Sequence, residues 1–205
     1  MAWDTERTRR LLLDAAVAEF GERGLAGARV DRIAAAAGVN KERIYKYFGT
    51  KDQLFAIVIA REIGELGEAV QVEGEGTAAV IGYAERFFDH LCDKPALARL
   101  LFWESLELGA PVAESERRES MLGKIRAIRD AVPELPESAA RELLLTILSL
   151  CYSWHALPTL DRLATATEPD AARRSARRTA IGETVAAELA LHVSDDASVT
   201  RQWSG

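Results

Sequence analysis

Apolar residues recur at helical spacing along this whole chain, and glycines interrupt the pattern at short intervals. Leu12, Ala16 and Phe20 repeat every four residues until Gly24. No stretch alternates apolar and polar residues with the period of two that is typical of a strand. The pattern therefore predicts an all-α protein whose first helix covers about residues 5–23 and stops at Gly24.

Two short helical segments follow the first helix. A helix predicted over about residues 29–37 ends at Gly38, which supplies the turn after it. Asn40 then caps a helix of about two turns over residues 41–48, and Thr50 caps the helix after that. Two short helices joined by a glycine-containing turn, with a longer helix bracing them, form a helix-turn-helix unit.

The two-turn helix over residues 41–48 separates aromatic from charged side chains. A projection at 100° per residue places Ile44, Tyr45, Tyr47 and Phe48 in one arc, which is expected to hold the helix to its bundle. The opposite arc carries Glu42, Arg43 and Lys46. A basic outward face with tyrosines at its edges suits the major groove of DNA. The alternative is a solvated helix with an apolar back.

Charge is distributed unevenly along the chain. The 205 residues carry a formal net charge of −6, which argues against a protein that coats nucleic acid generally. Residues 29–51, however, hold six basic and two acidic residues, a local charge of +4. Residues 62–205 hold 15 basic and 24 acidic residues, a charge of −9. The sequence thus predicts a basic head on an acidic body, with any nucleic-acid contact confined to the head.

Four short motifs in residues 5–60 resemble the DNA-binding domain of the tetracycline-repressor (TetR) family of transcriptional regulators. They are an A-x-x-x-F-x-x-x-G start, an I-A-x-x-A-G-V turn, I-Y-x-Y-F in the two-turn helix, and T-K-x-x-L-F after it. The resemblance implies about nine helices, a homodimer in the cytoplasm, and repression at an inverted-repeat operator in double-stranded DNA until a small-molecule effector binds. It also implies a helix-turn-helix domain over residues 1–60 and a helical ligand-binding and dimerisation domain over 61–193. A disordered tail is expected over 194–205.

The resemblance also assigns roles to individual residues of the head. Base edges are expected to meet Lys41, Glu42, Tyr45 and Lys46, and phosphates to meet Tyr47, Lys51 and Arg29, with Arg32 and Arg43 suited to either. Two features depart from the family pattern. Ala28 and Arg29 stand where a Ser or Thr cap is common, and Glu42 stands where a small residue is common. Glu42 has an alternative role, which is to pair with Lys46 one turn away.

Beyond the head, the periodicity predicts only helices. The fourth helix is expected to reach about Val72, where the sequence EGEGT breaks it. Further helices are expected over about 76–92, 95–109, 112–131, 137–156 and 168–192, with Thr167 capping the last and Pro158 ending or interrupting the one before.

The last two predicted helices are expected to serve a dimer as well as the core. The helix over 137–156 is apolar nearly all round, so it must be covered on more than one side. The predicted interface residues are Leu144, Ile147, Cys151, Ile181, Val185 and Leu189. A monomer that buries both faces is the alternative. Four arginines, Arg173, Arg174, Arg177 and Arg178, are interpreted as a solvated or cross-subunit face.

An effector cavity is expected among the fifth to eighth helices. Its candidate lining residues are Phe87, Phe88, Leu91, Phe102, Trp103, Glu104, Met121, Ile125, Tyr152 and His155. Most of these residues would also serve as ordinary core. Glu104 and His155 are the candidate polar anchors.

Other functional classes find little support in the sequence. Its three histidines are far apart, and it lacks an H-E-x-x-H or C-x-x-C motif and a glycine-rich phosphate loop. No catalytic residue, metal site or cofactor is predicted. The apolar run over 143–160 is barely long enough for a membrane span and is broken by Pro158, so no membrane association is expected. Two alternatives remain: a small-molecule-binding protein with a vestigial DNA-binding head, and an architectural DNA-binding protein without an effector.

Overall fold

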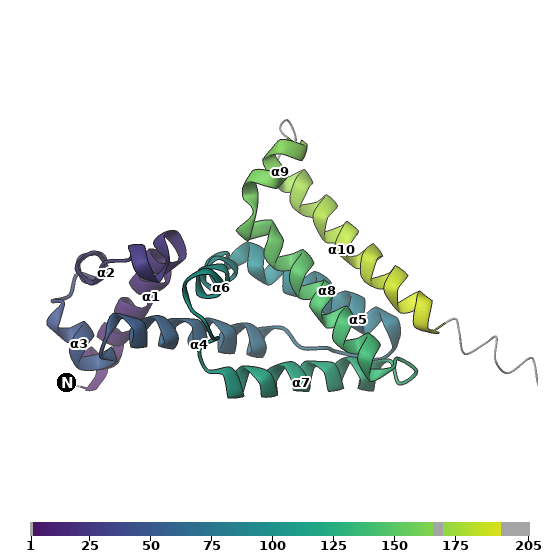
Figure 1. The fold of residues 1–205 in the computed structure, drawn as a ribbon, viewed down its shortest axis with the longest axis horizontal. Helices are drawn as coiled ribbons and strands as arrows, with labels where there is room; N and C mark the ends of the chain where they lie inside the picture. The colour runs from purple at the N-terminus through teal and green to yellow at the C-terminus, as the bar shows by residue number, and fades with distance from the viewer. Residues whose placement is uncertain (1, 166–169, 194–205) are drawn as a thin grey trace, which may run out of the picture. The chain divides into compact units, whose positions relative to one another are not determined.

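The computed structural model describes residues 2–165 and 170–193. Within these residues the chain forms ten helices and no strand, which confirms the all-α prediction with one helix more than expected (Figure 1). In chain order the helices are α1 (Ala2–Gly27), α2 (Val30–Ala37), α3 (Glu42–Phe48), α4 (Lys51–Ala69), α5 (Gly76–Asp93), α6 (Ala96–Glu107), α7 (Glu114–Ala131), α8 (Glu137–Ala156), α9 (Pro158–Thr165) and α10 (Asp170–Val193). The tail predicted over 194–205 and the cap predicted at Thr167 lie outside the described residues.

Local sequence signals account for most of the helix boundaries. Gly24 breaks α1 with φ 68° and ψ −177°, and Gly38 ends α2 in the left-handed region with φ 64°. The predicted cap at Thr50 is confirmed, because its hydroxyl accepts a hydrogen bond from the Gln53 amide at 3.2 Å. The Gln53 side chain accepts one from the Thr50 amide in return, at 2.8 Å, which completes a capping box.

The tenth helix arises at Pro158. The predicted helix over 137–156 is present as α8, and Pro158 ends the run as expected. The proline also starts α9, because a first helical position has no need of the missing N–H. A bend of 80° separates α8 from α9. At the other predicted boundary in this part of the chain, α4 ends at Ala69 and does not reach Val72.

The chain divides into two compact units, and the first combines residues 1–66 with residues 94–115. In this unit α1 packs against both α2 and α6. Its core includes Phe20 and Phe55, whose rings meet edge to face at 5.1 Å, and Leu100 of α6. The predicted domain boundary at residue 60 assumes continuous segments, whereas α6 joins the first unit across the sequence because it covers α1.

The second unit combines residues 67–93 with the described residues 116–165 and 170–193. Its described helices α5, α8 and α10 lie side by side and contact one another in all three pairs (Figure 1). A chain of aromatic rings joins α5 to α8, with Tyr83 and Phe87 at 5.9 Å and Phe87 and Tyr152 at 5.6 Å. These contacts, with the buried leucines of α8, form the core of the unit.

Candidate nucleic-acid interface

Two buried residues hold helix α3 to the rest of the first unit. Ile44 and Phe48 are 0% and 4% exposed and belong to the core of the first unit. The helix begins at Glu42, one residue later than predicted, with Lys41 as the capping position. The Asn40 side chain still accepts a weak hydrogen bond from the Glu42 amide at 3.4 Å. Burial of one face therefore orients the other face outward.

The outward face of α3 presents both charged and aromatic groups. Lys41, Glu42, Arg43, Tyr45 and Lys46 are all exposed. The helical projection was wrong for Tyr45, which does not pack on the bundle, since 54% of its surface is accessible. Ile44 and Phe48, with Tyr47 partly packed against the same core, anchor the short helix, which leaves the Tyr45 hydroxyl available to a partner.

Tyr47 has a different environment from Tyr45. It is half-buried, and the Arg9 guanidinium of α1 lies over its ring at 5.9 Å and over the Phe48 ring at 5.0 Å. The same guanidinium donates a hydrogen bond to the Tyr47 carbonyl at 3.4 Å. Arg9 therefore braces the C-terminal end of α3 against α1.

Glu19 of α1 replaces the side-chain cap that α2 lacks. Its carboxylate accepts a hydrogen bond from the Arg29 amide at 2.9 Å and one from the Arg32 side chain at 2.7 Å. Arg32 also donates to the Gly27 carbonyl at 2.8 Å. Burial would raise the pKa of the Glu19 carboxyl, but the hydrogen bonds from Arg32 and the Arg29 amide outweigh it and hold the pKa below its usual value. Arg32 is thus fixed by the fold before any DNA is present.

Two lysines of the interface also have partners within the chain. The Lys41 ammonium pairs with Asp31 at 3.2 Å, and this hydrogen bond raises the pKa of Lys41. Lys51 donates to the Ala28 carbonyl at 3.2 Å. Arg43 makes only a marginal contact, at 3.5 Å, with the hydroxyl of Thr8. The Lys46 side chain has no hydrogen bond or ion pair with any described residue. It can therefore reach a phosphate or a base without breaking an existing interaction.

The structure separates the predicted effector-lining residues between the two units. Phe102, Trp103 and Glu104 belong to α6 in the first unit. Glu104 is buried and accepts a hydrogen bond from the Val112 amide at 2.8 Å, so it holds the loop after α6. The other seven predicted residues, Phe87, Phe88, Leu91, Met121, Ile125, Tyr152 and His155, lie in the second unit. Phe87, Phe88 and Leu91 are fully buried there.

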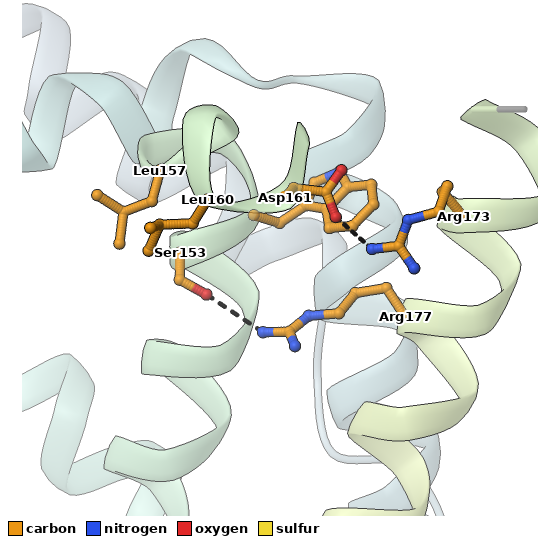
Figure 2. Close-up of a pocket in the computed structure, with 7 residues that line it drawn as sticks. Ser153, Leu157, Leu160, Asp161, Arg173 and Arg177 are labelled. Atoms are coloured by element: carbon orange, nitrogen blue, oxygen red, sulfur yellow. Dashed lines mark hydrogen bonds and ion pairs between the residues drawn. The ribbon is translucent and has the colours of Figure 1, made fainter. Parts of the chain in front are cut away.

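The predicted arginine cluster of α10 is engaged within the chain. Figure 2 shows Arg173 and Arg177 beside a hollow of ≈ 220 Å³ between α8, α9 and α10, with Arg173 paired to Asp161 and Arg177 donating to Ser153. On the α5 side, Arg178 pairs with Asp89 at 2.8 Å. Arg174 and Arg178 remain about 40% exposed, so the interpretation as a solvated or cross-subunit face stays a prediction. Sequence spacing alone does not reveal the carboxylates of α5 and α9 that pair with Arg173, Arg174 and Arg178.

The six residues predicted at a dimer interface lie inside the protomer. Leu144, Ile147, Cys151, Ile181, Val185 and Leu189 are each no more than 1% exposed. They fill the contact between α8, α10 and α5. These six side chains are therefore not available to a partner subunit in this conformation, whereas Leu145 of α8 and Leu191 of α10 are exposed by 51% and 71%.

Among the described residues there is no group of three or more His, Cys, Asp or Glu side chains able to hold a metal ion. No single described helix is both long and apolar enough to cross a membrane, and the bent pair of α8 and α9 passes that test only when the two are taken together.

Comparison with known proteins bears on both parts of the chain. Residues 12–58 match the family model for bacterial regulatory proteins of the tetR family, and residues 80–186 match the tetracyclin repressor-like C-terminal domain. The chain belongs to the TetR family. It is therefore a DNA-binding transcriptional regulator, and α2 and α3 are its helix-turn-helix.

Individual relatives of this TetR-family regulator agree with the assignment. It is 43% identical over 131 residues to the HTH-type transcriptional repressor SCO4008 of Streptomyces coelicolor, covering 63% of this chain and 67% of the relative. It is 25% identical to the repressor NicS of Pseudomonas putida, covering 75% of this chain and 78% of that one. Among solved structures, the transcriptional regulator SCO4942 of Streptomyces coelicolor is similar with a TM-score of 0.71 and 35% identity, covering 86% of this chain and 97% of that one.

Sequence reasoning missed the residues that support the interface from behind. Glu19, Asp31 and Arg9 hold Arg32, Lys41 and the end of α3. These partners come from a different helix or turn, so no local spacing rule identifies them. The absence of a Ser or Thr cap before α2 was the one available signal, because an uncapped helix start needs an acceptor from elsewhere.

Proposed function

We propose that this TetR-family regulator is a homodimeric repressor that binds an inverted-repeat operator and is released from it by a small-molecule effector. The exposed face of α3, with Lys41, Tyr45 and Lys46 outward and Ile44 and Phe48 buried, is the observation that carries the proposal. Two relatives, SCO4008 and NicS, are repressors by name. Since its target is chromosomal DNA, the proposed site of action is the cytoplasm.

Within the proposed complex, the residues of the head divide into those that read bases and those that contact phosphates. Lys46 and Tyr45 are exposed and read base edges; a lysine donates to guanine O6 and N7. Lys41 and Glu42 take part in the same readout at the start of α3. Tyr47, Lys51, Arg29, Arg32 and Arg43 contact phosphates, which positions the helix without specifying sequence.

The proposed dimer places two copies of α3 in successive major grooves, about 34–36 Å apart for half-sites one turn apart. Its interface uses the faces of α8 and α10 that the protomer leaves open, including Leu145 and Leu191. Ala176 and Ala180 are exposed on α10, and their small size permits a close approach of the partner helix. A stable interface of this kind buries about 1,200–2,000 Å² in total.

Release requires that the effector prefer a conformation that cannot span both half-sites. Moving the equilibrium from 1:99 to 99:1 needs a preference of about 5.5 kcal/mol. The effector is proposed to bind in the second unit, which holds Phe87, Phe88 and Tyr152. It would act through α4, whose residues run from one unit into the other.

Selection from random duplex DNA by the purified, ligand-free protein tests the proposal. We expect enrichment of one inverted repeat by the wild type and loss of enrichment by a Tyr45→Ala/Lys46→Ala variant. Arg162→Ala is the matched control, because Arg162 is an exposed cation on α9 in the second unit. Light scattering on the same samples reports the oligomeric state.

The alternatives give different results in this experiment. A folded protein that enriches no sequence would have a vestigial head, and the proposal would fail. Enrichment without release by any compound in a broad effector screen would instead identify an architectural DNA-binding protein. Enrichment of a single half-site by a monomer would refute the dimer.

A further inference from the structure

A pocket of ≈ 240 Å³ opens in the second unit, separate from the hollow of Figure 2. It lies between the end of α4, the linker that follows it, α5 and α7. The residues that define its chemistry are Val70, Gln71, Val72, Tyr83, Ser120 and Lys124. Its volume is below the range of about 300–1,000 Å³ that is typical of pockets for drug-sized ligands. The pocket therefore suits a compact molecule.

Tyr83 lines this pocket and has a buried hydroxyl. The residue is 1% exposed, and its hydroxyl has no hydrogen-bond partner within the described part of the chain. A buried polar group in this state is costly, because it has lost its water without gaining a replacement. The ring contact with Phe87 at 5.9 Å fixes the side chain from behind. An acceptor on a bound molecule would satisfy the hydroxyl.

Lys124 supplies a positive charge to the same pocket. It is half-buried on α7, and its ammonium donates a hydrogen bond to the Ser120 hydroxyl at 3.2 Å. No carboxylate among the described residues pairs with it, whereas Lys41 and Lys94 each have one. Burial lowers the pKa of Lys124, because the charged form has lost water and no anion among the described residues compensates for that loss.

We propose that this pocket binds a small monocarboxylate, whose oxygens accept hydrogen bonds from the Tyr83 hydroxyl and the Lys124 ammonium. A single ammonium balances one negative charge, which favours a carboxylate over a phosphate dianion. Val70 and Val72 offer apolar surface to the rest of the molecule. This inference rests on the proposed function, because it names the chemical class of the effector.

Two helical glycines at the pocket fit the same interpretation. A Cβ added at Gly67 of α4 would meet no atom within 4 Å, and one at Gly123 of α7 would meet only the end of the Arg126 side chain, at 3.9 Å. Packing within the protomer therefore does not require glycine at either position. Glycine inside a helix costs about 0.5–1 kcal/mol relative to alanine. The missing side chains leave room for an occupant.

Calorimetry on the purified full-length protein tests the proposal with defined probes. The panel consists of straight-chain monocarboxylates from acetate to octanoate, with benzoate and phenylacetate, each paired with its primary amide. We expect at least one carboxylate to bind about tenfold or more tightly than its amide, because the amide has the same shape without the charge. The same carboxylate should raise the thermal midpoint of unfolding.

Three variants test the assignment of residues. Lys124→Met should weaken binding of that carboxylate about tenfold or more, and Arg162→Met, which removes an exposed cation of α9, should leave it unchanged. Tyr83→Phe should raise the thermal midpoint of the ligand-free protein and still weaken binding several-fold. A purely structural tyrosine would not affect binding.

Each failure has its own meaning. The proposal is overturned if no carboxylate binds more tightly than its amide, or if binding is insensitive to both Lys124→Met and Tyr83→Phe. A neutral compound that releases the operator from a protein indifferent to carboxylates would overturn it and leave the proposed function intact. Loss of operator selection with carboxylate binding intact would overturn the proposed function alone.

Discussion

Replacement of Glu19 by alanine is expected to destabilise the helix-turn-helix, because one carboxylate organises the start of α2. Glu19 accepts the Arg29 amide at 2.9 Å and the Arg32 side chain at 2.7 Å. Its side chain is only 11% exposed. Without it, the first amide of the turn loses its acceptor and Arg32 loses its anchor.

The magnitude follows from these two contacts. Loss of a helix cap costs about 1 kcal/mol. The ion pair with Arg32 adds about 0–1 kcal/mol, since Arg32 is 38% exposed and its charge is partly screened by water. A total of about 1–2 kcal/mol corresponds to a fall of about 2–8 °C in the thermal midpoint for a protein of this length.

Thermal denaturation at pH 7, at fixed protein concentration, measures this effect. Glu22→Ala is the matched control, because Glu22 lies on the same helix with its side chain 62% exposed and, among the described residues, forms an ion pair with its neighbour Arg23 alone. The Glu19→Gln variant keeps one acceptor and should fall between wild type and Glu19→Ala. Equal thermal midpoints for Glu19→Ala and Glu22→Ala would refute the capping role.

The pH dependence provides a second test of the Glu19 assignment. Because the folded protein lowers the pKa of Glu19 below 4.5, the stabilisation is fully present above that value and is lost as the pH falls through the folded pKa. The difference in unfolding free energy between wild type and Glu19→Gln should therefore shrink on acidification below pH 4.5. A difference that stays constant down to acid unfolding would show that charge plays no part.

Three other changes have expected outcomes. Gly24→Ala should lower the free energy of unfolding by about 1–3 kcal/mol, as measured by chemical denaturation. Gly38→Ala should lower it less, because a Cβ at Gly38 meets no atom within 4 Å, whereas a Cβ at Gly24 lies 2.8 Å from the Trp103 ring. Asp31→Asn should raise the affinity for non-operator DNA about two- to fivefold at low salt, measured by fluorescence anisotropy, because it removes a negative charge beside Lys41. Cys151 is buried, and burial raises the pKa of its thiol to about 12. Alkylation of Cys151 by iodoacetamide at pH 8, measured by mass spectrometry, should therefore occur only after the protein is denatured.

Features set by local sequence were predictable. Gly24, Gly38 and Thr50 act through their own backbone or through residues within one turn, and the structure has the expected break, turn and cap at each. The span of α8 agrees with the predicted helix over 137–156, and Pro158 ends it as expected. The family resemblance, which rests on residues 5–60, added the function that periodicity alone left open.

Features set by tertiary contact were not predictable in the same way. Helical periodicity shows that Leu144 and Ile181 face something apolar, but it does not say whether the neighbour belongs to the same chain or to a second copy. In the protomer both are buried. The position of α6 against α1 also depends on contacts between residues far apart in sequence, and for that reason Trp103 lies near Gly24 within the first unit.

The local charge of +4 over residues 29–51 already counts Asp31, but it leaves out Glu19 of α1, whose carboxylate pairs with Arg32. Arg32 is held by Glu19, and Lys41 by Asp31, while Lys46 has no partner among the described residues. Exposed pairs are worth about 0–1 kcal/mol, so a phosphate can replace Asp31 at little cost. Asp31 would then remain as an unpaired negative charge near the DNA, and its repulsion from the phosphates would oppose binding. This repulsion counts for more where the phosphate makes a poor contact with Lys41. We therefore expect the pair of Lys41 and Asp31 to lower the affinity for non-operator DNA more than the affinity for the operator. Lys46 is expected to raise both affinities.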